Sequence, residues 1–91
     1  MTEKNDNTIF VGKKPLMSYV LAVVTQFGDG IKEVHIKARG KSISSAVDIA
    51  QIVKNKFVKD VNIDKVEIGT DKVENEGKEL NVSTIDILLK K

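Results

Sequence analysis

Two short stretches of this chain bring cationic side chains together on loops that contain glycine. Gly12-Lys13-Lys14-Pro15 places two ammonium groups side by side, with the only proline of the sequence behind them. Ala38-Arg39-Gly40-Lys41 places a basic residue on each side of a glycine. The two adjacent lysines have no obvious internal partner, and an unpaired charge is costly to bury. We therefore expect these cations to face water or the phosphates of a nucleic acid.

Other kinds of chemistry have little support in the sequence. The single histidine, His35, lies between Glu33 and Lys37 on the polar side of a predicted strand, and one histidine in this setting is not a metal-binding motif. There is no cysteine, so the chain can form neither a disulfide nor a thiolate site. The glycine before the paired lysines lacks the spacing of a phosphate-binding loop. We expect no catalytic residue, no metal and no cofactor, and therefore no enzyme.

The composition fits one small folded domain. The 91 residues are 41% hydrophobic and 31% charged, and no apolar run approaches the roughly 20 residues that a membrane span requires. Residues 1–7 are polar and unlike a targeting signal, so we expect a flexible tail there and a single domain at 8–91. The expected location is cytoplasmic, with no membrane partner. A monomer of this size is only modestly stable, which favours an oligomer.

The net charge of +2 is divided unevenly along the chain. Residues 9–59 contain nine basic side chains against three acids, whereas residues 60–91 contain five lysines against eight acids. A basic surface on the body would neutralise phosphates and release counterions, which gives salt-sensitive binding with little sequence preference. A solvated charged surface without a ligand is the alternative.

The residues around the two basic loops predict the elements that position them. Residues 8–11 predict a strand, and apolar residues at helical spacing predict a helix over 16–27, with Gly28 as the left-handed glycine just after its cap. Alternation predicts a second strand over 31–38, followed by a helix capped by Ser44 or Ser45 with Asp48. Each basic loop thus follows a strand and precedes a helix. If these strands are parallel neighbours, both loops lie at one edge of the sheet.

The last third of the chain predicts a long hairpin. Glu76-Gly77 is a suitable two-residue turn. Pairing about this turn places three apolar pairs opposite each other: Val66–Ile87, Ile68–Ile85 and Val73–Leu80. The last pair falls on the other face of the ribbon, so the base joins the sheet and residues 71–82 project as an arm. The fold class is α+β, a β-α-β-α-β-β two-layer sandwich with a mixed four-stranded sheet and two helices on one face.

The aromatic residues predict no surface for stacking bases. Phe10, Tyr19, Phe27 and Phe57 are the only aromatics, and most of them fall on core-facing sides of the predicted elements. The predicted buried face of the second helix consists of Ile43, Ala46, Val47, Ala50, Val53 and Phe57. We therefore expect binding through phosphates rather than through bases.

Four segments together resemble the Alba family, small chromatin proteins of archaea. They are Ile9–Tyr19 (IFVGKKPLMSY), Ile36–Val47 (IKARGKSISSAV), Ile52–Asp60 (IVKNKFVKD) and Val82–Ile87 (VSTIDI). The similarity extends over nearly the whole chain, from Thr8 to Lys91. It implies a fold like the C-terminal domain of bacterial translation initiation factor three and a homodimer. It also implies a chromosome-associated protein that binds double-stranded DNA, and often RNA, with little sequence preference.

The resemblance also implies roles for particular residues. Lys13 and Lys14 match loop lysines that lie on the duplex backbone, and one of them matches a position that is acetylated in some members. Arg39 and Lys41 match further phosphate contacts, and Lys37, on the strand that leads to them, is a further candidate for nucleic-acid binding. The arm, with Lys72 and Lys78, matches a hairpin that reaches toward the minor groove. Phe57 matches an aromatic at the contact through which dimers line up along DNA; a core-facing position is the alternative for it.

The arm departs from the family pattern because it is acidic. Residues 71–79 contain Asp71, Glu74, Glu76 and Glu79 against Lys72 and Lys78, and such an arm should be repelled by a phosphate groove. We therefore expect binding mainly through the body loops. Two other functions stay open: an RNA-binding protein, as a ribonucleoprotein subunit or RNA chaperone, and a structural or regulatory oligomer whose acidic arm engages a protein partner.

Overall fold

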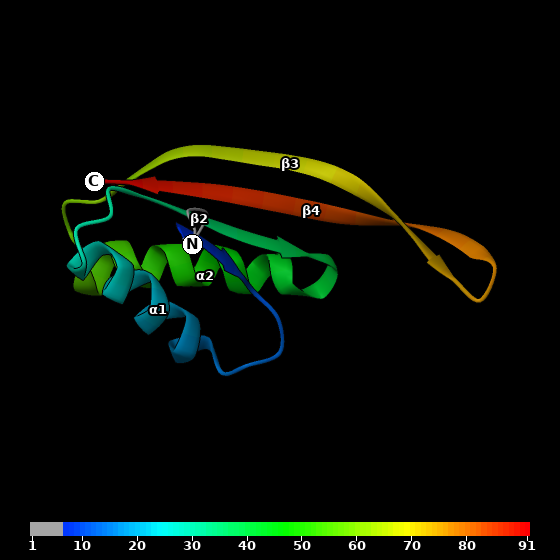
Figure 1. Ribbon diagram of the computed structural model, residues 1–91, viewed down its shortest axis with the longest axis horizontal. Coiled ribbons are helices and arrows are strands. Elements are labelled where there is room, and N and C mark those ends of the chain that lie inside the picture. Colours follow the sequence, from blue (N-terminus) through cyan, green and yellow to red (C-terminus); the bar gives the residue numbers. More distant parts are fainter. Residues whose placement is uncertain (1–6) are drawn as a thin grey trace.

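The computed structural model describes residues 7–91, which form two layers. The strands are β1 (Thr8–Phe10), β2 (Glu33–Arg39), β3 (Asn62–Asn75) and β4 (Lys78–Lys90), and the helices are α1 (Leu16–Gly28) and α2 (Ile43–Ile52). The sheet order is β1-β2-β4-β3, with β1 parallel to β2 and the other pairs antiparallel. Both helices pack on one face of the sheet (Figure 1). The predicted fold class is confirmed; the tail predicted at residues 1–7 lies, except for Asn7, outside the described residues.

The core lies between the helices and one face of the sheet. Alternate residues of the two central strands are buried there: Val34, Ile36 and Ala38 of β2, and Ile85, Ile87 and Leu89 of β4. The helices contribute Val20, Val23 and Phe27 from α1, and Ala46, Ile49 and Ala50 from α2. The residues between them on β2 and β4 point to the helix-free face, as alternation requires. The two-residue periodicity predicted for β2 is therefore confirmed.

The glycine that follows the cap of helix α1 lies two positions later than predicted. The left-handed residue is Gly30, with φ of 96°, and its N–H donates to the Phe27 carbonyl. The Ile31 N–H donates to the Gln26 carbonyl, which completes a Schellman motif. The prediction of Gly28 as the glycine after the cap is wrong because Gly28 is the last residue of the helix and Asp29 is the cap.

Helix α2 begins earlier than its serines predicted. A 3-10 turn at Gly40–Ser42 leads directly into Ile43, and Ser42 at the cap makes no side-chain hydrogen bond. The predicted capping box of Ser45 and Asp48 is wrong because both residues lie inside the helix. At the other end, a π-helical turn at Val53–Phe57 widens the last turn, and Phe57 is 44% exposed. The core-facing interpretation of Phe57 is wrong, and Val47 is also exposed.

The hairpin has the predicted register. All three apolar pairs are found, and Glu76 and Gly77 form the turn with φ of 52° and 77°. Pairing between β2 and β4 ends at Arg39–Thr84, so beyond it β3 and β4 continue as a two-stranded arm (Figure 1). β3 is an edge strand of the sheet, and the helices do not cover the side chains of its central part. For this reason Ile68 is 82% exposed although its partner is buried.

Candidate nucleic-acid interface

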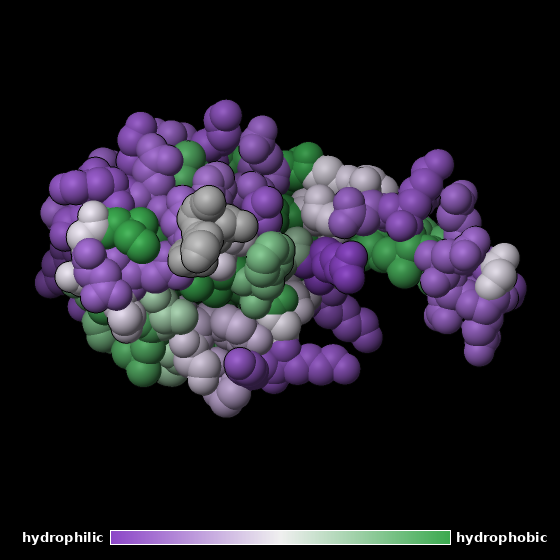
Figure 2. All heavy atoms as spheres, in the orientation of Figure 1, coloured by the Kyte–Doolittle hydropathy of each residue, from purple (hydrophilic) through white to green (hydrophobic). Residues whose placement is uncertain are grey.

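Both basic loops lie at the end of the body from which the arm projects (Figure 1). This follows from the parallel pairing of β1 and β2, whose carboxyl ends lead into the two loops. Lys13 and Lys14 of the first loop and Arg39 and Lys41 of the second are all exposed. Long hydrophilic side chains project from this end of the body in Figure 2. We call these four residues the basic loop surface.

Tyr19 holds the first loop in place. Its hydroxyl oxygen accepts hydrogen bonds from the backbone N–H groups of Gly12, at 2.9 Å, and Lys14, at 3.0 Å. Tyr19 itself is buried in the first turns of α1. On the strand side, the Val11 N–H donates to the Lys37 carbonyl at 2.9 Å. The backbone of the loop is therefore fixed from both sides, and the side chains of its two lysines extend from this fixed backbone.

The sequence interpretation missed this role of Tyr19. It placed the residue only on the apolar stripe of the helix. A signal was present, because a buried tyrosine hydroxyl needs a hydrogen-bond partner and the lysine loop lies one helical turn away. Gly12 also fits the contact closely: a Cβ at this position would lie 3.4 Å from the Tyr19 oxygen.

Lys37 and Arg39 differ from the loop lysines because acids lie beside them. Lys37 Nζ is 3.8 Å from Asp86 Oδ2, and an Arg39 guanidinium nitrogen is 3.7 Å from Asp71 Oδ2. These contacts are long and exposed, so each contributes little to stability. Among residues 7–91, Lys13, Lys14 and Lys41 make no ion pair. A phosphate would meet the loop lysines without displacing a carboxylate, whereas at Arg39 it would compete with Asp71.

His35 lies on the helix-free face and contacts an acid from a distant part of the chain. Its Nδ1 is 2.9 Å from Asp86 Oδ1, so Asp86 lies between His35 and Lys37. In the described part of the chain, no cluster of three or more potential metal ligands occurs. The contact is a local polar network on the sheet surface.

Some basic residues lie away from this surface. Lys54 Nζ donates to the Val61 carbonyl at 2.9 Å, and Lys54 and Lys56 lie on the π-helical turn. That turn is at the end of α2 opposite the basic loop surface (Figure 1). The positive charge of residues 9–59 is therefore divided between two ends of the body.

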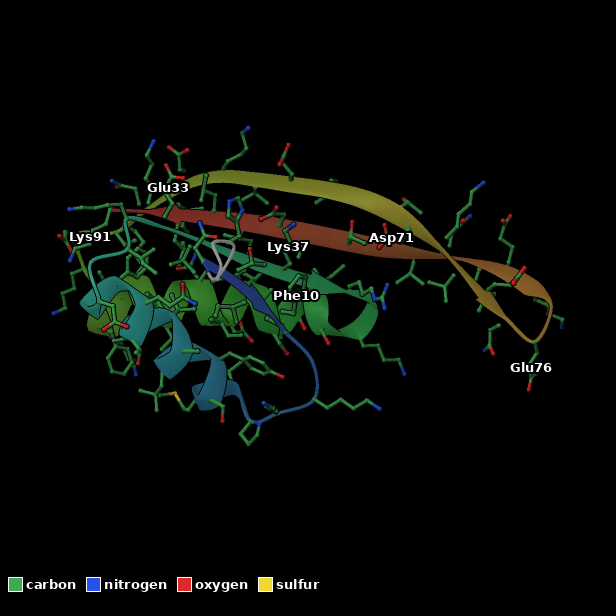
Figure 3. The ribbon with its side chains drawn as sticks, viewed as in Figure 1. Phe10, Glu33, Lys37, Asp71, Glu76 and Lys91 are labelled. Atoms are coloured by element: carbon green, nitrogen blue, oxygen red, sulfur yellow. The ribbon has the colours of Figure 1, made fainter. Side chains whose placement is uncertain are left out.

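The arm presents its acids to solvent. Glu74 lies directly opposite Glu79, and two like charges in this position destabilise a strand pair. Glu76 lies at the turn (Figure 3), and the outer arm is mainly hydrophilic in Figure 2. Lys72 and Lys78 are also exposed, and both pair with asparagines across the ribbon, Asn81 and Asn75.

Two of the aromatics are not where the sequence predicted. Tyr19 and Phe27 are buried, but Phe10 is 73% exposed and Phe57 is also at the surface. Phe10 is on the edge strand β1 and pairs with Lys37, so both side chains lie on the helix-free face. The core-facing placement that the sequence analysis gave most aromatics is therefore wrong for Phe10.

Within residues 7–91, no helix is both long and apolar enough to cross a membrane.

Comparison with known proteins gives consistent matches over nearly the whole chain. The profile of the Alba family matches residues 7–70. The DNA/RNA-binding protein Alba of Methanocella arvoryzae is 56% identical over 87 residues, covering 94% of this chain and 91% of that protein. The DNA/RNA-binding protein Alba 1 of Archaeoglobus fulgidus is 51% identical, covering 94% of this chain and 97% of that protein.

Solved structures agree with these matches. Alba from Thermoplasma volcanium superposes with a TM-score of 0.89 at 49% identity, covering 92% of this chain and 99% of that chain. ALBA1 from Trypanosoma brucei superposes with a TM-score of 0.78 at 24% identity, covering 98% of this chain and 72% of that chain. The second likeness concerns the fold alone.

Tyr19→Phe tests the clamp on the lysine loop. Removing the hydroxyl leaves two backbone N–H groups without their acceptor, so the free energy of unfolding should fall by about 1–2 kcal/mol. Hydrogen exchange at the amides of Gly12 and Lys14 should become faster. Lys14→Ala is the control, because it removes a charge but keeps its N–H bonded to Tyr19. Unchanged exchange in Tyr19→Phe would show that the loop is held by other contacts.

Proposed function

The chain belongs to the Alba family, and we propose that it coats and compacts double-stranded DNA as a homodimer, with little sequence preference. The observation that carries this proposal is the pair Lys13 and Lys14, exposed and without an ion pair in residues 7–91, on a loop fixed by Tyr19. Arg39 and Lys41 at the same end, with Lys37 behind them, extend the cationic surface. The names of the relatives, DNA/RNA-binding proteins, support the nucleic-acid binding in this proposal.

The fixed loop makes phosphate binding efficient. Because the backbone of residues 12–14 is already ordered, little conformational entropy is lost there on binding. Lysine contacts to phosphates release condensed counterions and carry no sequence information. At Arg39, a phosphate would replace the carboxylate of Asp71. We infer a binding role rather than a catalytic one, and a chromosome-associated protein of the cytoplasm.

An exposed apolar strip supports the homodimer. Val66 and Ile68 of β3 lie on the helix side of the sheet but beyond the helices, and they are 53% and 82% exposed. Large apolar side chains exposed together on a small domain are typical of a subunit interface. A twofold partner on this strip would give the assembly two basic loop surfaces. Phe57, exposed at the far end of α2, is a candidate for the contact between dimers along DNA.

Acetylation would act directly on this surface. Modification of Lys13 or Lys14 would remove one charge while leaving the backbone hydrogen bonds to Tyr19 in place. Lys72 and Lys78 give the arm a smaller part, because the four acids around them oppose entry into a groove.

RNA is the second candidate ligand. The relatives are named for both nucleic acids, and a surface that binds phosphates can also bind an A-form helix. A role in ribonucleoproteins or as an RNA chaperone would use the same lysines. The third candidate is a structural or regulatory oligomer whose acidic arm binds a protein.

The double variant Lys13→Ala/Lys14→Ala tests the DNA proposal. The slope of log affinity against log salt for a DNA duplex should become shallower by about one to two units, because each lost phosphate contact removes roughly 0.9. Lys56→Ala/Lys59→Ala, with the same loss of charge away from the basic loop surface, should change the slope little. A matched RNA duplex measured in parallel decides between the ligands, since tighter RNA binding favours the second candidate. Intact duplex binding by the loop variant would favour the third.

Glu74→Gln/Glu76→Gln/Glu79→Gln tests the effect of the acidic arm. Removing three negative charges should tighten duplex binding by roughly two- to fivefold at low salt, with a smaller gain as salt screens the repulsion. Asp60→Asn/Asp64→Asn is the control, with acids removed at the other end of the hairpin. The arm variant removes three charges and the control two, so equal tightening per charge removed would show that net charge rather than arm position is responsible.

Ile68→Lys tests the subunit contact. A charge on an apolar strip that the partner subunit would bury should shift the protein from dimer to monomer in sedimentation experiments at micromolar concentration. Val24→Ala on α1 is a control away from the strip. A variant that stays dimeric would place the subunit contact elsewhere.

A further inference from the structure

A shallow hollow lies on the sheet, lined mainly by residues of the helix-free face. Its volume is about 650 Å³, which is in the range of sites for small ligands. The lining side chains that can bind a ligand are Phe10, Lys37, Arg39, Glu67, Asp71 and Asp86. Phe10 and Arg39 end the strands that lead into the two basic loops, so the hollow adjoins the basic loop surface.

The strand register explains how these residues meet. Phe10 pairs with Lys37, Lys37 with Asp86, and Asp86 with Glu67, so one row of side chains crosses all four strands. Figure 3 shows Phe10 and Lys37 on neighbouring strands, with Asp71 where the arm leaves the body. The row has an aromatic ring at one end and a carboxylate at the other.

A glycine leaves the floor of the hollow open. Gly69 pairs with Thr84, which pairs with Arg39, and this row lies next to the first. A Cβ at Gly69 would lie only 3.2 Å from Thr84 Oγ1. Glycine inside a strand weakens it and often marks the close approach of a ligand to the backbone. Gly69 lies on β3, at the edge of the sheet opposite Phe10, so the floor is open beside Glu67 rather than beside the aromatic ring.

The charges in the hollow favour a neutral ligand over a phosphate. The lining contains two basic residues and three acidic ones: Lys37, Arg39, Glu67, Asp71 and Asp86. Both basic side chains already lie beside a carboxylate. The excess of acids would repel a phosphate from the floor. Carboxylates accept hydrogen bonds, and an exposed phenylalanine stacks on flat rings. An unpaired nucleobase, flat and with N–H groups on its edge, has both properties.

Glu67 suits one base in particular. Guanine presents N1–H and N2–H side by side on its pairing edge, and the two oxygens of one carboxylate can accept both. Among residues 7–91, Glu67 makes no ion pair, so its oxygens are available. It lies three strand spacings from Phe10, about 14 Å. Lys37 and Asp86 lie between the two residues in this row, so a purine stacked on Phe10 reaches an outstretched Glu67 side chain only by extending over both of them.

We propose that the hollow binds an unpaired guanine of a single-stranded segment, stacked on Phe10 and hydrogen-bonded by Glu67. The phosphates on either side of that guanine lie on the basic loop surface, so this inference rests on the proposed function. It adds a base-reading site to a surface that otherwise reads only the backbone. The ligand is a single-stranded region of RNA or DNA, such as a loop or an overhang.

The experiment compares four probes by fluorescence anisotropy on the full chain. They are a short uridine oligomer, the same oligomer with one guanosine or one inosine at its centre, and a blunt DNA duplex. Phe10→Leu keeps the apolar bulk but removes the stacking face, and Phe10→Tyr restores that face. Glu67→Gln keeps the shape of the side chain but removes the two-oxygen acceptor. Phe10 and Glu67 are exposed, and thermal melting of each variant verifies the fold.

The wild-type protein should bind the guanosine oligomer more tightly than the inosine or uridine oligomers. Phe10→Leu should weaken guanosine binding by about five- to tenfold, Phe10→Tyr should not, and duplex binding should stay within about twofold. Glu67→Gln should remove the preference for guanosine over inosine. No guanosine preference in the wild-type protein, or equal losses on oligomer and duplex in Phe10→Leu, would overturn the proposal. Loss of duplex binding in Lys13→Ala/Lys14→Ala tests the proposed function separately.

Discussion

Two hydrogen bonds to one phenol oxygen determine where the lysine loop lies. The Tyr19 hydroxyl accepts from the backbone of Gly12 and Lys14, and so connects the first strand, the loop and the first helix. Because the bonds go to the backbone, the side chains of Lys13 and Lys14 are left for solvent or ligand. The parallel pairing of β1 and β2 then places the second basic loop at the same end of the body. The position of the basic loop surface thus depends on a residue that is itself buried.

Pairing with acids divides the cations into two groups. Lys13, Lys14 and Lys41 have no ion-pair partner in the described residues, whereas Arg39 and Lys37 lie beside Asp71 and Asp86. The acids come from β3 and β4, the strands that continue into the arm. The same strands therefore moderate the positive charge of the body and carry negative charge outward. A polyanion would find its best contacts on the loops and its worst at the tip of the arm.

Short-range patterns predicted most of the fold, and contacts between distant residues were harder to predict. Alternation located β2, and the turn at Glu76-Gly77 gave the hairpin register, because both depend on neighbouring residues. The core position predicted for Phe57 was wrong, because a π-helical turn is set by packing at the end of α2 and has no clear sequence signal. The exposure of the loop lysines could be predicted. The Tyr19 clamp and the His35–Asp86 contact could not, because each joins residues that are brought together only by the folding of the chain.

The position of β3 has a consequence for association between copies of the chain. It is a 14-residue edge strand, and one row of its backbone N–H and C=O groups has no neighbour within the described sheet. Such an edge is a template for further strands and can lead to ordered aggregates. Lys65, Glu67, Asp71 and Glu74 place charge along it, and charged side chains discourage this kind of growth. The same acids that give the arm its negative charge would therefore also keep the sheet from extending indefinitely.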